Sequence, residues 1–487
     1  MTTDKQQMAL AELLDIVRAG GVPVAGHSAK VVPGGAFVAV AGTAADGARF
    51  VPDALERGAA YVVAAAGTAL PAGATARLIE VADPKAALGA LAGARYGTDR
   101  MAMPVVAVTG TNGKTTVSYL LERLGAAAGR KVGVLGTVAY RWPGFSRDAS
   151  LTTPDCLTIH ENLGAMARAG CDLAIMEASS HALDQDRLAG LSFAAAAFTN
   201  LTQDHLDYHR DMETYFAAKA KLFRNYLAAP QNAVLNFDDP FGLRLLREFP
   251  QGVGYGLGQP PRGFARLLAG CMREHGRDGL VLGVGFGDTA FEVASPMPGR
   301  HNAANILAAM GLALVLGLPA ETFAALADFH GAPGRLERIP NPSGLTVLVD
   351  YAHTPDALEN VLSAAREFTP GRLFAVFGCG GDRDRTKRPR MAAAVARFAD
   401  VAVLTSDNPR HEDPLAIMDD ARPGLAGARR AILEPDRHRA IELALGEMGP
   451  EDVLVIAGKG HETYQQIGDV KYPFSDAAVV RELTGCA

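Results

Sequence analysis

Apolar runs alternate with helix-like segments along most of the chain that follows Pro104. The runs PVVAVT, CDLAIMEAS and AAAAFTN have the length of buried strands, and KTTVSYLLERLGAAAG carries its apolar residues at the spacing of one helix face. Strands that alternate with helices usually form a parallel sheet covered by helices on both faces. The pattern therefore predicts an α/β fold.

A second series of the same kind begins near Leu345, with the strand-like runs LTVLVDYA, RLFAVFGCG, DVAVLTSDN and DVLVIAGKG. The stretch between the two series, HGAPGRLERIPNPSG, contains the glycines and prolines that are typical of a domain boundary. A smaller α/β segment comes before both series. Because 487 residues exceed what one hydrophobic core usually supports, we expect three domains, at 1–101, 102–331 and 332–487.

Composition and charge exclude several classes of protein. The net charge of −6 gives no basic surface for nucleic acid, so small molecules are the expected partners. The start, MTTDKQQMAL, lacks the basic and then apolar pattern of a secretory signal, and we expect no membrane span. Five cysteines without a CxxC pair suit neither a zinc site nor a disulfide framework. These features favour a cytoplasmic protein.

The strongest local motif is a glycine-rich loop that follows the strand PVVAV and opens a helix. Its glycines let backbone N–H groups face phosphate oxygens, Lys114 can reach the β- and γ-phosphates, and Thr115 can bind Mg²⁺. The general P-loop pattern has glycine where Val108 stands, and an ordinary strand-to-helix turn is the alternative. The Lys-Thr pair favours a nucleotide site. Its residues are Gly110, Thr111, Asn112, Gly113, Lys114, Thr115 and Thr116.

Glu177 closes the predicted strand CDLAIMEAS at the end where doubly wound sheets place their ligands. A single glutamate at a strand end is equally often a solvated carboxylate. Together with Lys114 and Thr115, however, it favours a Mg²⁺ site beside the phosphates of a nucleotide.

Several segments besides the glycine-rich loop resemble one family, the Mur ligases. They are GTNGKTT, TTPD, MEASSH, NLTQDHLDYH, AAKAKLF, GRHNAANILAA and DYAHTPDAL, and they occur in the family's order over nearly the whole chain. The resemblance implies a small N-terminal UDP-binding domain, a central ATP-binding domain and a Rossmann-like C-terminal domain that binds an amino acid.

The resemblance also implies roles at the ATP site. Lys114, Glu177, His205 and Lys219 would be catalytic. Thr115 and Glu177 would hold Mg²⁺ beside the phosphates, His205 would hold a second Mg²⁺, and a CO₂-derived carbamate on Lys219 would be an additional magnesium ligand. Asn302, Arg335, Asp350 and His353 would contact the nucleotide. From the residues alone, Lys219 could be a surface lysine and His205 a surface or capping residue. Their roles follow from the family.

For the other two substrates the resemblance implies two further sets of contacts. A UDP-muramoyl dipeptide would meet Ser28, Thr43, Ala44, Thr152, Thr153, Ser179, Gln185 and Arg187, although the family usually has DSR where this chain has HSA at residues 27–29. The segment DNPR matches members that add diaminopimelate, whereas members that add lysine change its arginine. The amino acid would meet Arg383, Asp407, Asn408, Pro409, Arg410, Gly458 and Glu462.

The reaction implied by the resemblance joins meso-diaminopimelate to the D-glutamyl carboxylate of UDP-N-acetylmuramoyl-L-alanyl-D-glutamate in peptidoglycan biosynthesis. ATP would first convert that carboxylate to an acyl phosphate, and the family expectation is a monomer. A folylpolyglutamate synthetase, or a Mur ligase for another substrate, is the alternative among enzymes. A nucleotide-driven switch or motor, or a sensor of cell-wall precursors, is the alternative from another class.

Overall fold

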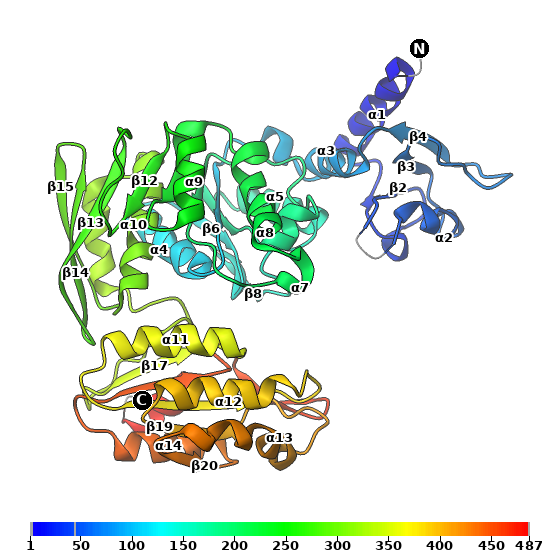
Figure 1. Ribbon diagram of the computed structural model, residues 1–487. Helices are drawn as coiled ribbons and strands as arrows, with labels where there is room; N and C mark the ends of the chain where they lie inside the picture. Colours follow the sequence, from blue (N-terminus) through cyan, green and yellow to red (C-terminus); the bar gives the residue numbers. More distant parts are fainter. Residues whose placement is uncertain (1–2, 43–44, 486–487) are drawn as a thin grey trace.

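The computed structural model describes residues 3–42 and 45–485, and it contains three successive α/β bodies, each with its own sheet. In Figure 1 the blue N-terminal body lies beside the central one, and the yellow to red C-terminal body lies below it. The mixed α/β architecture expected from the sequence is confirmed. Within the described part of the chain, no helix combines the length and the apolar character that a membrane crossing requires.

The N-terminal sheet has four parallel strands in the order β1-β2-β3-β4. Helix α3 begins after Asp83, whose carboxylate accepts hydrogen bonds from the first free backbone N–H groups, and it ends at the left-handed Gly97. The elements are α1 Thr3–Arg18, β1 Val24–Ala25, β2 Ala36–Val38, α2 Val51–Glu56, β3 Tyr61–Ala65, β4 Arg77–Val81 and α3 Pro84–Tyr96.

The central sheet has eleven strands in the order β15-β14-β13-β12-β11-β10-β5-β9-β6-β7-β8. Its middle is parallel, as the sequence predicts, but antiparallel hairpins extend both edges. The strands are β5 Val105–Thr109, β6 Val132–Leu135, β7 Ala139–Trp142, β8 Phe145–Asp148, β9 Leu173–Glu177, β10 Ala195–Phe198, β11 Ala233–Asn236, β12 Val253–Gly256, β13 Leu267–Gly276, β14 Gly279–Phe286 and β15 Thr289–Ser295.

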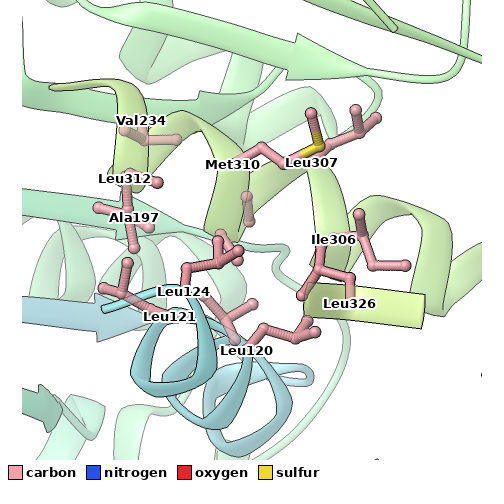
Figure 2. Close-up of a cluster of buried hydrophobic side chains, with 14 of the residues drawn as sticks. Leu120, Leu121, Leu124, Ala197, Val234, Ile306, Leu307, Met310, Leu312 and Leu326 are labelled. Atoms are coloured by element: carbon pink, nitrogen blue, oxygen red, sulfur yellow. The ribbon is translucent and has the colours of Figure 1, made fainter. Parts of the chain in front are cut away.

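Two helices on one face of the central sheet hold the glycine-rich loop in place. Leu120, Leu121 and Leu124 of α4 pack against Ile306 and neighbouring residues of α10 (Figure 2); α4 covers β5, β6 and β9, and α10 covers β10, β11 and β12. This buried layer fixes the start of α4 relative to the sheet. The helices of this domain are α4 Lys114–Ala127, α5 Cys156–Arg168, α6 Ser180–Asp184, α7 Leu206–His209, α8 Met212–Lys221, α9 Pro240–Glu248 and α10 Arg300–Val315.

The C-terminal sheet has the order β16-β17-β21-β18-β19-β20, and all of its pairs except β16–β17 are parallel. A separate hairpin, β22–β23, follows β21. The elements are β16 Glu337–Arg338, β17 Thr346–Asp350, α11 Pro355–Glu367, β18 Leu373–Cys379, α12 Lys387–Phe398, β19 Val401–Ser406, α13 Pro414–Ala421, β20 Ala431–Leu433, α14 Arg437–Glu447, β21 Val453–Ala457, β22 Tyr464–Ile467, β23 Val470–Pro473 and α15 Asp476–Leu483.

Direct backbone contact joins the N-terminal domain to the central one. Helix α3 packs on α5 and on the loop after α6, where a Cβ added at Gly89 would lie 2.3 Å from the carbonyl carbon of Ala189. An ion pair of 2.9 Å between Lys85 and Asp186 lies in the same interface. The C-terminal domain reaches the central one through Arg338, which donates to Asp278 at 2.8 Å.

We predict that Gly89→Ala weakens the docking of the N-terminal domain. Alanine favours a helix over glycine, but the new methyl group would overlap backbone atoms that cannot move alone, so the free energy of unfolding should fall by about 1–3 kcal/mol. Calorimetry measures this change. The control is Gly446→Ala in α14, where the space around the Cβ is open and stability should rise by up to about 1 kcal/mol. An equal increase in the free energy of unfolding in Gly89→Ala and Gly446→Ala would contradict this interpretation of the interface.

Candidate active site

The glycine-rich loop lies where three neighbouring strands of the central sheet end. β5 pairs with β9 on one side, in a register that sets Val108 opposite Glu177, and with β10 on the other, which sets Thr109 opposite Phe198. The carboxyl ends of parallel strands share one edge, so Gly110, Glu177 and the segment after Phe198 meet there. This confirms that the sheet brings Glu177 to the loop.

The loop conformation depends on two glycines at positive φ. Gly110 has φ 146° and Gly113 has φ 87°, and a Cβ at these positions would lie 1.9 Å from Thr199 Oγ1 and 2.3 Å from Asn305 Oδ1. Thr111 N donates to the carbonyl oxygen of Asn200 at 2.8 Å, which ties the loop to the end of β10. Only glycine allows this close approach of the loop to β10 and α10.

Two lysines converge on one carbonyl oxygen of the loop. Lys114 Nζ donates to Gly110 O at 3.0 Å and to Thr111 O at 2.8 Å, and Lys219 Nζ donates to the same Gly110 O at 2.8 Å. Lys219 is 1% exposed, so it is not the surface lysine that the sequence alone allowed. Burial, reinforced by the positive charge of Lys114, holds the pKa of Lys219 well below its usual range. Burial also lowers the pKa of Lys114.

Glu177 is buried and held by two threonines. Its carboxylate accepts hydrogen bonds from Thr115 Oγ1 at 3.0 Å, from Thr137 N at 2.9 Å and from Thr137 Oγ1 at 2.8 Å. A carboxylate beside a hydroxyl at the start of a P-loop helix offers the oxygen ligands that Mg²⁺ prefers. In the described part of the chain no three His, Cys, Asp or Glu side chains gather into a metal site. Glu177 and Thr115 fit this ion.

His205 precedes α7 in a left-handed conformation, with φ 52°, and its ring is exposed beside Asp204. Its ring centroid lies 6.2 Å from that of Tyr215, and Lys219 Nζ lies 4.7 Å from the centroid of the same Tyr215 ring. His209 also stacks on Tyr215, and burial lowers the pKa of His209 to about 4. The structure therefore places His205 and Lys219 around one aromatic ring.

The residues expected near a peptide substrate form one hydrogen-bonded group next to Glu177. Arg187 donates to Thr153 O at 2.9 Å and, through a second nitrogen, to Gln185 Oε1 at 2.8 Å. Thr153 Oγ1 donates to Glu177 O at 2.7 Å and accepts from Ser179 N at 3.0 Å. The structure thus unites these four side chains with the strand end that carries Glu177.

Thr152 is linked to Glu177 through Thr137. The Oγ1 atoms of Thr152 and Thr137 lie 3.1 Å apart, and Thr137 Oγ1 donates to the Glu177 carboxylate. Ser28 lies apart from it, buried in a short 3₁₀ turn of the N-terminal domain. Thr43 and Ala44 lie outside the described residues.

The residues expected near the nucleotide come from two domains. Asn302 lies in the first turn of α10, where its amide donates to Pro298 O at 2.8 Å, and Asn305, one turn further on, approaches Gly113. Asp350 ends β17 with a buried carboxylate that accepts from Leu336 N and Ala352 N, and burial raises its pKa.

Arg335 and His353 lie in the C-terminal domain, on either side of β17 in the sequence. Arg335 is half-buried, lies over the Tyr351 ring at 5.3 Å, and contributes to the lowered pKa of Lys114. His353 follows β17 and is exposed, with Nδ1 2.7 Å from Tyr351 O. Of these two residues, Arg335 is the one whose charge influences the glycine-rich loop, through the pKa of Lys114.

A cavity of about 360 Å³ opens where β17, β18, β19 and β21 end in the C-terminal sheet. Four segments that lie far apart in the sequence meet here because their strands are parallel neighbours. Of the residues expected to bind an amino acid, the cavity is lined by Arg383, Asp407, Asn408, Arg410, Gly458 and Glu462. Pro409 lies outside this lining and borders a neighbouring groove.

Backbone geometry shapes this cavity. Arg410 has φ 51° and donates from Nη1 to Gly381 O at 2.7 Å. Gly458 has φ 117°, and a Cβ there would lie 2.4 Å from Asp407 Oδ2, so a side chain at this position would displace the carboxylate.

Sequence reasoning missed three polar residues of these sites. Thr137 lies in GTVAY, which contains no recognisable motif. Lys459 and His461 lie within AGKGHE, whose Gly458 and Glu462 were selected. Lys459 is fully buried among the cavity residues, and burial lowers the pKa of His461 beside Arg335. For Lys459 and His461, their place in the AGKGHE motif was the sequence signal that could have identified them.

The fold and the site define a three-domain α/β protein with a P-loop in its central domain and a polar cavity in its C-terminal domain. Residues 24–96 match the Mur ligase family catalytic domain, residues 108–313 the Mur ligase middle domain and residues 334–460 the Mur ligase glutamate ligase domain. The chain belongs to the Mur ligase family.

Individual relatives carry a more specific name. A protein of Lawsonia intracellularis named UDP-N-acetylmuramoyl-L-alanyl-D-glutamate–2,6-diaminopimelate ligase is 50% identical, over 94% of this chain and 95% of its own. One of Thermosynechococcus vestitus with the same name is 48% identical, over 93% and 91%. A solved structure of a ligase of that name is 34% identical, with a TM-score of 0.69 over 95% of this chain and 94% of that one.

We predict that Thr137→Val lowers nucleotide turnover by about tenfold to a hundredfold, the usual cost of removing a group that orients a metal-binding side chain. Valine keeps the shape of threonine but removes the hydroxyl that donates to Glu177, so the carboxylate would lose one of its restraints. ADP formation at saturating ATP measures the effect. Thr369→Val is the control, because its hydroxyl contacts only a helix carbonyl. Unchanged turnover in Thr137→Val would show that Glu177 needs no such support.

Proposed function

We propose that this protein is an ATP-dependent ligase that joins meso-diaminopimelate to UDP-N-acetylmuramoyl-L-alanyl-D-glutamate. The observation that carries the proposal is the presence of two polar sites, each at the carboxyl ends of parallel strands. The central domain holds the P-loop with Lys114 beside Glu177, and the C-terminal domain holds the cavity of Arg410 and Glu462. The relatives that match almost the full length of the chain carry the name of this reaction.

The chemistry follows from the two sites. A carboxylate does not react with an amine until its oxygen becomes a good leaving group. The D-glutamyl carboxylate oxygen attacks the γ-phosphorus of ATP, the bond to ADP breaks, and an acyl phosphate forms. The neutral amine of diaminopimelate then attacks the acyl carbon, the C–O bond to phosphate breaks, and the nitrogen releases one proton, which leaves an amide N–H and inorganic phosphate. The chain needs no covalent nucleophile, because its task is positioning and charge neutralisation.

Each element of the P-loop site contributes to that task. Lys114 donates to the carbonyl oxygens of Gly110 and Thr111 within the loop, and its side chain can turn from them to the phosphates of ATP. Arg335 adds positive charge from the other domain. Mg²⁺, when bound, would neutralise charge on the transferring phosphoryl group. Thr115, Glu177 and His205 would hold it, with a carbamate on Lys219 as the additional anion.

Lys219 has the properties that carbamate formation requires. A neutral amine attacks CO₂, the N–C bond forms, and one N–H proton leaves to solvent, so a cation becomes an anion. Burial beside Lys114 favours the neutral amine. The carbamate anion would then offset the positive charge of Lys114, which donates to the same Gly110 carbonyl oxygen as Lys219.

The remaining contacts complete the proposed assignment. Domains 1–101, 102–331 and 332–487 would bind UDP, ATP and the amino acid, respectively. Ser28, Thr43 and Ala44 would contact the uridine diphosphate, and the group around Arg187 and Thr153 would bind the dipeptide. We further propose that the protein acts as a cytoplasmic monomer in cell-wall synthesis, and thereby in cell shape and division.

We predict that Lys219→Ala abolishes most ligation while the fold stays intact. The variant cannot form the carbamate, so the metal loses one anionic ligand. A short carboxylate such as acetate, added to fill the vacancy, should restore part of the rate. Phosphate release and circular dichroism measure the two effects. Near-normal ligation by Lys219→Ala in CO₂-depleted buffer would refute the carbamate.

The function itself is tested by the mass of the product formed from ATP, Mg²⁺, the UDP-muramoyl dipeptide and an equimolar mixture of diaminopimelate and L-lysine. We expect the diaminopimelate increment, since Arg410 can bind the extra carboxylate that lysine lacks, and sites built for a polar group reject analogues without it by up to about 10⁴–10⁵. Arg410→Ala should lose this preference while the Michaelis constants for ATP and dipeptide change little. Equal wild-type efficiency with both amino acids would contradict the diaminopimelate assignment.

A further inference from the structure

Lys459 follows β21 and is fully buried beneath the cavity of the C-terminal domain. Its side chain is 0% exposed. Nζ donates to Asn408 Oδ1 at 3.0 Å and to Glu462 Oε2 at 3.3 Å, and it lies 3.7 Å from Asp407 Oδ1. All three partners line the cavity. A buried lysine is costly unless it is paired, and here every polar partner is a cavity residue.

These contacts fix the orientation of the Asn408 amide. Its Oδ1 accepts from Lys459 Nζ and also from Gln466 N at 2.8 Å. The Nδ2 group must therefore point the other way, where it donates to Glu462 Oε2 at 2.9 Å. Glu462 thus receives two donors, one from Lys459 and one through Asn408. The loop after β19 and the loop after β21 are joined by this one network.

The network also sets the charge of the cavity. Asp407 and Glu462 bring two carboxylates to it, and Lys459 lies within reach of both. Without the lysine these carboxylates would repel each other and would add negative charge to the wall that faces a ligand. A ligand end that carries a carboxylate would be disfavoured, whereas an end with only an ammonium would be favoured.

We propose that Lys459 is a positioning residue that holds Asn408 and Glu462 and, by offsetting their negative surroundings, makes the cavity prefer an amino acid whose distal end carries both an ammonium and a carboxylate. The inference rests on the proposed ligase function and names the part of the chain that sets its amino-acid preference. Arg410 supplies the direct partner for the carboxylate. Lys459 acts through Asn408 and Glu462 without touching the substrate.

The test compares catalytic efficiency with diaminopimelate and with L-lysine in the full-length protein. Lys459→Met keeps the length of the side chain and removes its charge. It should raise the KM for diaminopimelate and lower the diaminopimelate-to-lysine ratio of kcat/KM by about tenfold to a hundredfold, a usual cost of misplacing a binding group. The KM values for ATP and the UDP-dipeptide should change less than twofold. Lys459→Arg retains the charge and should restore part of the ratio.

The matched control is Lys471→Met. Lys471 also lies over the Tyr464 ring, at 3.9 Å compared with 5.7 Å for Lys459, but it is exposed and contacts none of the three cavity residues. Its loss should leave the ratio unchanged. A purely structural role for Lys459 would lower thermal stability and the amount of active enzyme, but it would leave the ratio between two amino acids intact.

If Lys459→Met does not fold, Lys459→Gln removes the charge, keeps an N–H donor for Asn408 Oδ1 and tests the same point. It should also lose the preference. A wild-type ratio in either folded variant would overturn the proposal. Failure of the ligase function is distinguishable, because the wild-type protein would then form no diaminopimelate product in the same assay.

Discussion

The central site depends on one carbonyl oxygen, that of Gly110, which accepts hydrogen bonds from both Lys114 and Lys219. Lys114 and Lys219 meet on this oxygen in a poorly solvated place, and the charge of Arg335 also lowers the pKa of Lys114, so a positive charge on either amine is costly unless an anion offsets it. Such a site is incomplete by itself, because buried charge requires a partner. Phosphate oxygens and an anion on Lys219 would both reduce the imbalance. The loop geometry therefore favours an anionic ligand before any substrate is considered.

The same topological rule produces both halves of the active site. In the central sheet and in the C-terminal sheet, parallel neighbours end at one edge, and the loops after them carry the polar residues. The first edge gathers the P-loop and Glu177. The second gathers Asp407, Arg410 and Glu462. The orientation of the domains then brings Arg335 towards Lys114, so that a phosphorylated intermediate formed at one edge would lie near the amine held at the other.

Burial gives the C-terminal cavity a definite charge and shape. Lys459 has no solvent to stabilise it, so it holds Asn408 and Glu462 in fixed positions. Arg410 is held by Gly381 O and by its left-handed backbone. A cavity whose polar groups are already oriented loses less entropy on binding and discriminates more strongly between ligands. Selectivity at this cavity thus depends as much on buried supports as on the residues that a ligand would touch.

The sequence by itself determined the α/β class, the P-loop and the order of the motifs, because strand and helix periodicities and glycine-rich turns are local properties of the chain. It also selected most of the residues that the two strand edges bring together, among them Glu177 and Arg410. Only the tertiary structure decided that Lys219 is buried, that Thr137 restrains Glu177 and that Lys459 supports Glu462. It also decided that antiparallel hairpins extend the central sheet. Burial, hydrogen-bond partners and charge proximity arise from segments tens of residues apart, and no local pattern in the sequence encodes which of them will meet.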